Sequence, residues 1–185
     1  MSLMAHQNNP SPFKLAFPFK PDKASQPLLW LLHRHGGSMD KLKLIKMIFL
    51  ADREHLVRYG RPIVGGNYVA MDLGLVSSDL KDYIEGKTAV KDLPFAIEGE
   101  YNLFAKQPTD EDWLSESELK VLDEVYEKYK HIDSIKLGLM THKYKAWRNN
   151  EPPKGSSKPV PYEDFFEDSD NQAMLDIILD NQGIL

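Results

Sequence analysis

Cysteine is absent from this chain of 185 residues. That absence excludes a disulfide framework, a thiol nucleophile and a thiolate metal site. Long apolar runs are absent too: the densest stretch, LKLIKMIFLA at residues 42–51, contains two lysines and falls short of the ~18 residues of a membrane span. The first residues lack the basic, apolar and small-residue order of a secretory signal. We therefore expect a cytoplasmic protein that does not associate with membranes.

An excess of basic residues is also missing. The 23 lysines and arginines face 28 acidic residues, which gives a formal net charge of −5. Proteins that bind nucleic acid usually present a basic face, because neutralising phosphates releases counterions. The lysines that do cluster, such as Lys41, Lys43 and Lys46, lie on a helix-like segment, where a solvated face explains them. Nucleic acid is therefore only a minor alternative as a partner.

What remains is the composition of an ordinary globular protein, in which 42% of the residues are hydrophobic and 28% are charged. The length suits one domain with a substantial core. We expect residues 22–185 to form a mainly α domain of the α+β class. Its expected architecture is a single helical bundle with a small antiparallel β-hairpin.

Residues 1–21 are expected to form an extended arm, because their prolines oppose regular structure. Within the arm, residues 1–3 resemble an addition before a natural start at Met4. The phenylalanines of the arm are expected to pack on the body of the domain or on a partner: Phe13, Phe17 and Phe19.

Local signals place the helices. The first is expected over residues 23–35, where four leucines precede the helix-stopping pair Gly36-Gly37. Ser38 is expected to cap a second helix that ends at Gly60, with apolar residues at helical spacing between them. Further helices are expected after the caps Ser77 or Ser78, Ser115 (with Glu118 as a capping box) and Asp133, and around residues 174–178.

Two other segments have different patterns. PFAIEGEYNLFAK, residues 94–106, alternates apolar and polar residues around Glu98-Gly99-Glu100, which predicts a β-hairpin with a glycine turn. EPPKGSSKPVP, residues 151–161, is rich in proline, glycine and serine, which predicts a loop.

The stretch RYGRPIVGGNYVAMDLGLVSS, residues 58–78, contains four glycines and raises the question of a phosphate site. A Walker loop needs a preceding strand and a Lys-Ser/Thr ending, and the dinucleotide pattern needs a strand before and a helix directly after its glycines. Here a helix precedes and Asn67-Tyr68-Val69 follows. We therefore expect turns at 61–62 and 65–67, then a short strand, and no nucleotide cofactor.

The titratable residues form no convincing catalytic or metal site. Asp52 and His55 share a helix face at a spacing of three residues, but no second pair of ligands is evident, and a polar helix edge explains them. The serines fit no G-x-S-x-G elbow. His142, within THKYKAW, is the residue that an enzymatic alternative would use together with a carboxylate. We expect a protein without catalytic activity, metal or cofactor.

Three segments taken together resemble a known family. They are KLKLIKMIFLADREHLVRYGRPIVGGNYVAMDLGLV (41–76), LSESELKVLDEVYEKYKHIDSIKLGLMTHKYKAWRNN (114–150) and KPVPYEDFF (158–166). Their order is similar to that of the Panacea domain, the SocA-like antitoxin family of bacteria and phages. In that family a lysine- and leucine-rich helix precedes a glycine turn, and an aromatic residue and an alanine precede Gly-Pro. This chain has Gly74-Leu75 where the family usually has Gly-Pro.

The resemblance implies an antitoxin, a non-catalytic domain that binds and silences a cognate toxin encoded by a neighbouring gene. The alternatives are an adaptor that delivers a partner to a protease, a nucleic-acid-binding regulator, and an enzyme that uses His142. Whether copies of the chain associate, and whether the change at Gly74-Leu75 alters toxin binding, both stay open. Turns and aromatic residues suggest these partner contacts: Arg61, Tyr68, Asp72, Gly74, His142, Tyr144 and Trp147.

Overall fold

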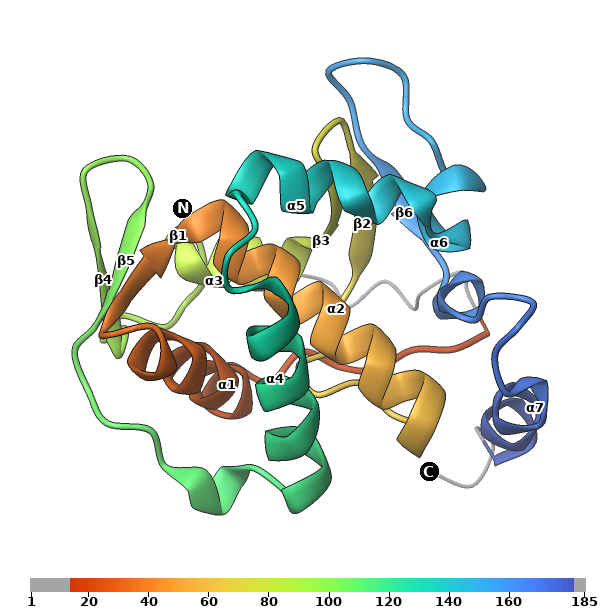
Figure 1. Cartoon of the computed structure of the whole chain (residues 1–185), viewed down its shortest axis with the longest axis horizontal. Coiled ribbons are helices and arrows are strands. Elements are labelled where there is room, and N and C mark those ends of the chain that lie inside the picture. The colour runs from red at the N-terminus through yellow and green to blue at the C-terminus, as the bar shows by residue number, and fades with distance from the viewer. Residues whose placement is uncertain (1–13, 182–185) are drawn as a thin grey trace, which may run out of the picture.

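The computed structural model describes residues 14–181. Figure 1 shows α2 running through the middle of the molecule, with the other elements around it. The helices are α1 (Pro21–Arg34), α2 (Lys41–Tyr59), α3 (Ser78–Ile84), α4 (Glu116–Tyr129), α5 (Ser134–Met140), α6 (Lys145–Arg148) and α7 (Gln172–Asn181). The strands are β1 (Ser38–Asp40), β2 (Tyr68–Met71), β3 (Gly74–Ser77), β4 (Phe95–Glu98), β5 (Asn102–Ala105) and β6 (Lys158–Val160). Within these residues, no helix combines the length and apolar character needed to cross a bilayer.

The central position of α2 follows from its sequence. Nearly every side chain from Leu44 to Val57 is buried, as expected for a helix in the interior of a domain. The helix packs against α1, α4, α5 and α7 as well as β3. It ends at Gly60, as predicted, because that residue adopts a left-handed φ of +80° and its N–H donates to Leu56 O at 2.9 Å.

The start of α2 differs from the prediction. The carboxylate of Asp40 caps the helix by accepting a hydrogen bond from the Lys43 N–H at 3.0 Å. Ser38, the predicted cap, instead lies in β1, where Met39 is paired with Leu103 of β5. The prediction that Ser38 caps the helix is wrong because residues 38–40 pair with β5, far along the chain, and so form a strand.

Other local predictions are confirmed. The side chain of Ser77 caps α3, and Asp133 caps α5 by accepting two backbone N–H groups. Ser115 and Glu118 form the predicted capping box at the start of α4, each side chain bonding the backbone of the other.

Two three-stranded antiparallel sheets lie beside α2 in the part of the chain described. The sheet β1-β5-β4 contains the predicted hairpin, with Ile97 opposite Leu103. In the sheet β3-β2-β6, the glycine-rich stretch forms a hairpin where one short strand was predicted. Its third strand comes from the end of the predicted loop, with Val160 opposite Tyr68. A single helical bundle with one hairpin is therefore too narrow a description, and the fold is α+β.

The described end of the N-terminal arm packs on the body of the domain. Leu15 is 1% exposed, and the Phe17 ring meets the Tyr162 ring edge-on at 4.9 Å. The Phe17 carbonyl accepts a hydrogen bond from the Gly66 N–H at 2.8 Å. A Cβ on Gly65 would lie 3.1 Å from that carbonyl oxygen, so glycine allows the close approach of the two segments. Phe13 and residues 1–3 lie outside the described residues.

Candidate functional site

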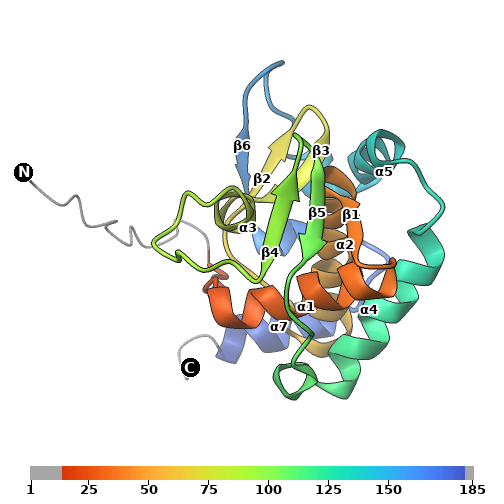
Figure 2. The same ribbon diagram turned by 90° about the vertical axis from the view of Figure 1, so that its left-hand side faces the viewer.

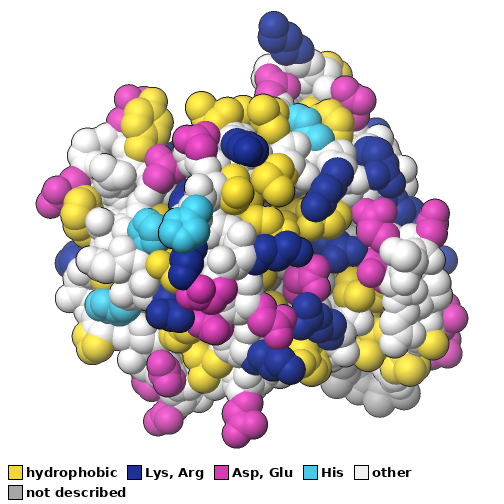
Figure 3. All heavy atoms as spheres, viewed as in Figure 1, with side chains coloured by type: hydrophobic (Ala, Val, Ile, Leu, Met, Phe, Trp, Pro, Cys, Tyr) yellow, Lys and Arg dark blue, Asp and Glu magenta, His cyan; other side chains and the backbone are white. Residues whose placement is uncertain are grey.

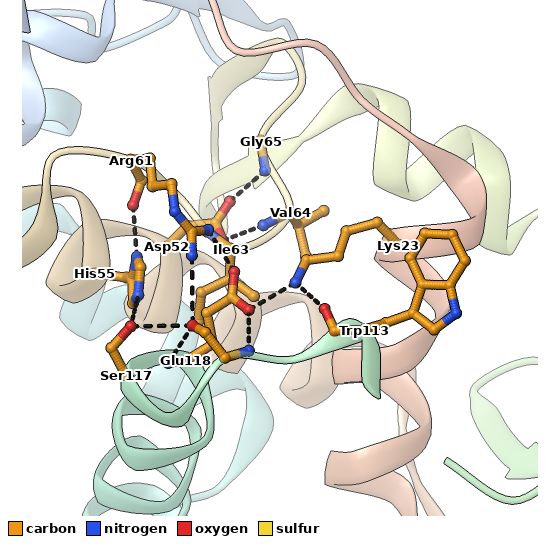
Figure 4. A network of polar contacts seen from close by, with 11 residues as sticks. Lys23, Asp52, His55, Arg61, Ile63, Val64, Gly65, Trp113, Ser117 and Glu118 are labelled. Carbon is orange, nitrogen blue, oxygen red and sulfur yellow. Dashed lines mark hydrogen bonds and ion pairs between the residues drawn. The ribbon is translucent and has the colours of Figure 1, made fainter. Parts of the chain in front are cut away.

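The buried carboxylate of Asp52 organises the glycine-rich stretch (Figure 4). Its Oδ1 accepts hydrogen bonds from the N–H groups of Ile63 and Val64 at 2.9 and 2.8 Å. Its Oδ2 accepts from the Gly65 N–H at 2.8 Å and the Tyr68 hydroxyl at 2.9 Å. Burial raises the pKa of Asp52 to about 6, although these hydrogen bonds act in the opposite direction. The amides of the glycine-rich stretch thus bind a carboxylate of the same chain and not a phosphate.

His55 is also buried and joins α2 to α4 (Figure 4). Its Nδ1 lies 2.7 Å from Arg61 O and its Nε2 lies 2.9 Å from Ser117 Oγ. The carbonyl requires Nδ1 to be the donor, so Nε2 accepts from the serine hydroxyl. Burial lowers the pKa of His55, which favours this neutral form. Asp52 and His55 are therefore buried structural groups, not the polar helix edge that the sequence suggested.

A buried ion-pair network lies next to His55. The carboxylate of Glu118 is fully buried, and it accepts hydrogen bonds from Lys23 Nζ at 2.6 Å, from Arg61 and from the Ser115 N–H. Burial raises the pKa of Glu118, but the bonds from Lys23 and Arg61 outweigh it and hold the pKa below its ordinary value. At this end of α2, Glu118 is paired with two cations and Asp52 is held by hydrogen bonds from uncharged groups. Among residues 14–181, no group of three or more histidine or acidic side chains is placed to hold a metal.

The opposite end of α2 opens into a groove of about 730 Å³. Figure 2 shows the tips of the β4–β5 and β2–β3 hairpins rising beside α5 on this side of the molecule. The groove is lined by the start of α2 and its cap (Asp40, Lys41, Leu42, Ile45, Lys46), the β2–β3 hairpin (Met71, Asp72, Leu73, Val76), α3 and the residue after it (Lys81, Glu85), the β4–β5 turn (Tyr101), the start of α5 (Ser134, Ile135) and the loop before β6 (Gly155, Ser156).

Large apolar side chains at the groove are open to solvent. Leu73 is 41% exposed, Tyr101 56% and Ile135 54%. One helical turn beyond Ile135, Leu139 is 49% exposed and extends the same surface along α5. Figure 3 shows hydrophobic side chains gathered over α5 on this face of the molecule. Apolar patches of this kind mark places where a protein contacts a partner.

Two glycines hold α5 against the β2–β3 hairpin. A Cβ on Gly138 would lie 2.7 Å from Leu73 O, and a Cβ on Gly74 would lie 2.5 Å from Gly138 O. Gly74 also has a left-handed φ of +91°. Thr141 Oγ1 donates to Gly138 O at 2.7 Å and accepts from the Leu75 N–H at 3.2 Å. Leu75 therefore uses an N–H group that a proline at that position would lack.

Lys46 forms part of the groove wall although it is 2% exposed. Its Nζ donates to Leu75 O at 2.8 Å, and this carbonyl is its hydrogen-bond acceptor among the described residues. Burial lowers the pKa of Lys46 to about 7. The prediction that Lys46 lies on a solvated helix face is therefore wrong.

The region that forms this groove matches a family model. Residues 44–148, more than half of the chain, match the model described as antitoxin SocA-like, Panacea domain. The chain belongs to this family. Comparisons with curated proteins and with solved structures find no match for it. The Panacea match runs from α2 to α6, so it includes both hairpins and all of α5.

Four of the partner contacts suggested by the sequence converge at the β2–β3 hairpin of this Panacea domain. Asp72 is exposed at the hairpin turn and accepts a hydrogen bond from the Gly155 N–H at 2.9 Å. Gly74 is buried in the same hairpin. His142 stacks on Trp147 with ring centroids 3.8 Å apart, and the indole Nε1 donates to the Met71 carbonyl at 3.0 Å. Asp72 thus lines the groove, while the other three support the hairpin.

The remaining three lie elsewhere. Contrary to the expectation that it faces a partner, Tyr68 is 2% exposed, because its hydroxyl bonds Asp52 inside the core. Arg61 is exposed at the far end of α2, where it pairs with Glu118. Tyr144 is partly buried beneath the guanidinium of Arg53, 4.8 Å from the centre of its ring, and burial raises its pKa.

Apart from Asp72, the residues suggested by the sequence as partner contacts do not line the groove, and its exposed apolar residues were missed. Ile135 lies in the helix predicted after Asp133, and the same short helix turns Leu137 and Gly138 to the core. Apolar residues on both faces of α5 were the available signal. Tyr101 offered another, since it is an aromatic residue in a hairpin turn between polar neighbours.

Proposed function

We propose that this Panacea domain is a cytoplasmic antitoxin that neutralises a toxin protein by direct binding, with the groove as its docking surface. The family supports an antitoxin-like role. The observation that carries the choice of surface is the exposure of Leu73, Tyr101 and Ile135 around one groove. Large apolar and aromatic side chains within a polar rim act as anchors in protein interfaces.

The extent of the apolar surface favours a protein over a small molecule as the partner. A small-molecule site buries most of its ligand between mostly apolar walls. Here the apolar rim is about half exposed, and Leu139 continues it along α5 outside the groove lining. A partner surface can cover both regions at once.

We also propose that the protein acts without catalysis. The stacking of His142 on Trp147 supports a packing role for the histidine on which the enzymatic alternative depends. The bond between His55 and Ser117 pairs a hydroxyl with an imidazole, as a nucleophile and its base would be. Its position inside the closed network between α2 and α4 supports a structural role instead.

The test is growth of a bacterial host that expresses the neighbouring gene alone or together with this chain. We expect arrest that the chain relieves, and co-purification of the two proteins. Ile135→Asp should abolish both. Ile177→Asp on α7 is the matched control, because Ile177 has the same 54% exposure but lies outside the groove lining.

Three results would count against this proposal. They are a harmless neighbouring gene, a toxin that stays lethal beside well-expressed antitoxin, and equal effects of the two isoleucine substitutions. The half-life of the toxin separates neutralisation by binding, which leaves it unchanged, from delivery to a protease, which shortens it.

A further inference from the structure

One end of the groove carries a cluster of like charges. The Nζ atoms of Lys41, Lys81 and Lys87 lie 3.3, 2.9 and 2.7 Å from the carboxylate oxygens of Glu85. Three ammonium groups therefore share one carboxylate, and we call these three residues the lysine cluster. Lys41, Lys81 and Glu85 line the groove itself. Counted against Glu85 alone, the cluster has an excess of two positive charges, and the nearby carboxylate of Asp82 also acts on Lys87.

The charge of Glu85 stays constant over the physiological range. Burial raises its pKa, but hydrogen bonds from Lys87 and Lys81 outweigh this and bring the pKa to about 2. The lysine side chains stay open to solvent, at 23% for Lys41, 35% for Lys81 and 58% for Lys87. Each ammonium group has three donors, so the cluster has N–H groups left for an incoming acceptor.

The other two acidic residues of the groove, Asp40 and Asp72, keep their own negative charges but pair with backbone N–H groups away from the cluster. Asp40 caps α2 through the Lys43 N–H, and Asp72 bonds the Gly155 N–H on the hairpin. Within residues 14–181, neither carboxylate forms a salt bridge with a lysine of the cluster. Lys46 adds a further amine to the wall of the groove, and its acceptor, Leu75 O, is uncharged.

The groove thus presents exposed apolar side chains beside a local cluster of lysines that outnumber the carboxylate they share. An apolar segment with glutamate or aspartate next to it matches both features, because its side chains cover the rim and its carboxylates meet free ammonium donors. Nucleic acid fits less well, since the rim is apolar and the whole chain has a net charge of −5.

We propose that the groove binds an acidic amphipathic segment of the toxin. The apolar side chains of that segment contact Leu73, Tyr101 and Ile135, and its carboxylates bind the lysine cluster. This inference rests on the proposed function, because it names the chemistry of the partner that occupies the same groove. It assigns the lysine cluster a part in recognition.

The first test uses the purified product of the neighbouring gene as the probe and the double substitution Lys41→Glu/Lys81→Glu in the full chain. We expect affinity to fall about tenfold or more, with a weaker dependence on salt, because like charges then oppose across the interface. The matched control is Lys120→Glu/Lys128→Glu on exposed positions of α4, which should change affinity less than about twofold. Lys41→Gln/Lys81→Gln, with melting temperatures for all variants, separates lost recognition from lost folding.

The result that overturns the inference is a groove variant that binds the toxin as well as the α4 control. The proposed function would then stand, because the antitoxin would still bind through its apolar rim. Salt-sensitive binding of a single-stranded oligonucleotide to the lysine cluster, in preference to the toxin, would also overturn it.

The second test examines the apolar and cationic character of the groove without the product of the neighbouring gene. The probes are 8-anilinonaphthalene-1-sulfonate, an apolar anion, and Nile red, which is apolar and uncharged. We expect Ile135→Asp to weaken the binding of both dyes, and Lys41→Glu/Lys81→Glu to weaken only the anion, by about tenfold. Equal binding of the anion by the wild type and the lysine variant would contradict an anion-binding role for the lysine cluster.

Discussion

The polar groups at the two ends of α2 differ in burial and in hydrogen bonding. At the C-terminal end, Asp52, His55 and Glu118 are buried and each is bonded by groups of the same chain. At the N-terminal end, Lys41 and Lys81 share one carboxylate beside apolar side chains that face water. Buried groups with all partners present stabilise a fold, whereas groups with unused bonding capacity at an apolar surface are available to a partner. The two ends of one helix thus differ in whether their polar groups have bonding capacity left for a partner.

The largest effect is expected from breaking the closed end. Asp52→Ala leaves three backbone N–H groups and the Tyr68 hydroxyl without their acceptor, which should lower the free energy of unfolding by about 3–5 kcal/mol. Asp72→Ala is the control, since this exposed carboxylate accepts one N–H, from Gly155, and should cost about 1 kcal/mol or less. Urea unfolding followed by circular dichroism measures both. Equal costs would mean that the carboxylate of Asp52 does not organise the loop.

The next effect concerns the packing that supports the open end. Gly74→Ala should cost about 3 kcal/mol or more, because the new Cβ would meet Gly138 O at 2.5 Å in addition to the strain at φ +91°. Gly36→Ala is matched in φ, at +89°, but meets nothing within 4 Å and should cost only about 1 kcal/mol. Thermal melting of the two variants isolates the steric term. A similar loss in both would show that α5 can move away from the hairpin freely.

The smallest effect expected is a pH dependence of stability that arises from the buried amine of Lys46. The pKa of Lys46 is about 7 in the fold and 10.5 as its ordinary value. Below pH 7 the amine is charged in both states and its burial penalty is complete. From pH 7 to 10.5 the folded form has released the proton that the unfolded form still holds, so stability rises with pH.

Relative to Lys46→Met, the wild type should therefore gain about 1 kcal/mol of unfolding free energy per pH unit above pH 7. Urea titrations of both proteins between pH 7 and 9.5 measure the difference, because the remaining lysines contribute equally to each. A constant difference across this range would place the amine of Lys46 in water, outside the groove wall.

The sequence predicted the parts of this structure whose causes lie within a few residues. The capping box of Ser115 and Glu118, the end of α2 at Gly60 and the β4–β5 hairpin are local, and each is confirmed. The strands β1 and β6 were missed, because their partners are distant along the chain. Ser38 had a good capping side chain and lost the role to Asp40 for that reason.

The candidate site divides in the same way. Turn residues and aromatic residues led from the sequence to Asp72 and Trp147, which do meet at the β2–β3 hairpin. The same reasoning placed Tyr68 at the surface. In the structure its hydroxyl donates a hydrogen bond to the carboxylate of Asp52 on α2, inside the core.

Residue types and short spacings were enough to indicate the family, the end of α2 at Gly60, the capping box of α4 and the absence of thiol chemistry. Only the tertiary structure decided which polar groups are satisfied and which apolar side chains stay in water. That outcome depends on packing: the closeness of Gly74 to Gly138 sets α5 on the hairpin, and this contact leaves Ile135 facing the groove. Burial and bonding capacity depend on which residues become neighbours in space, and short sequence patterns do not show this.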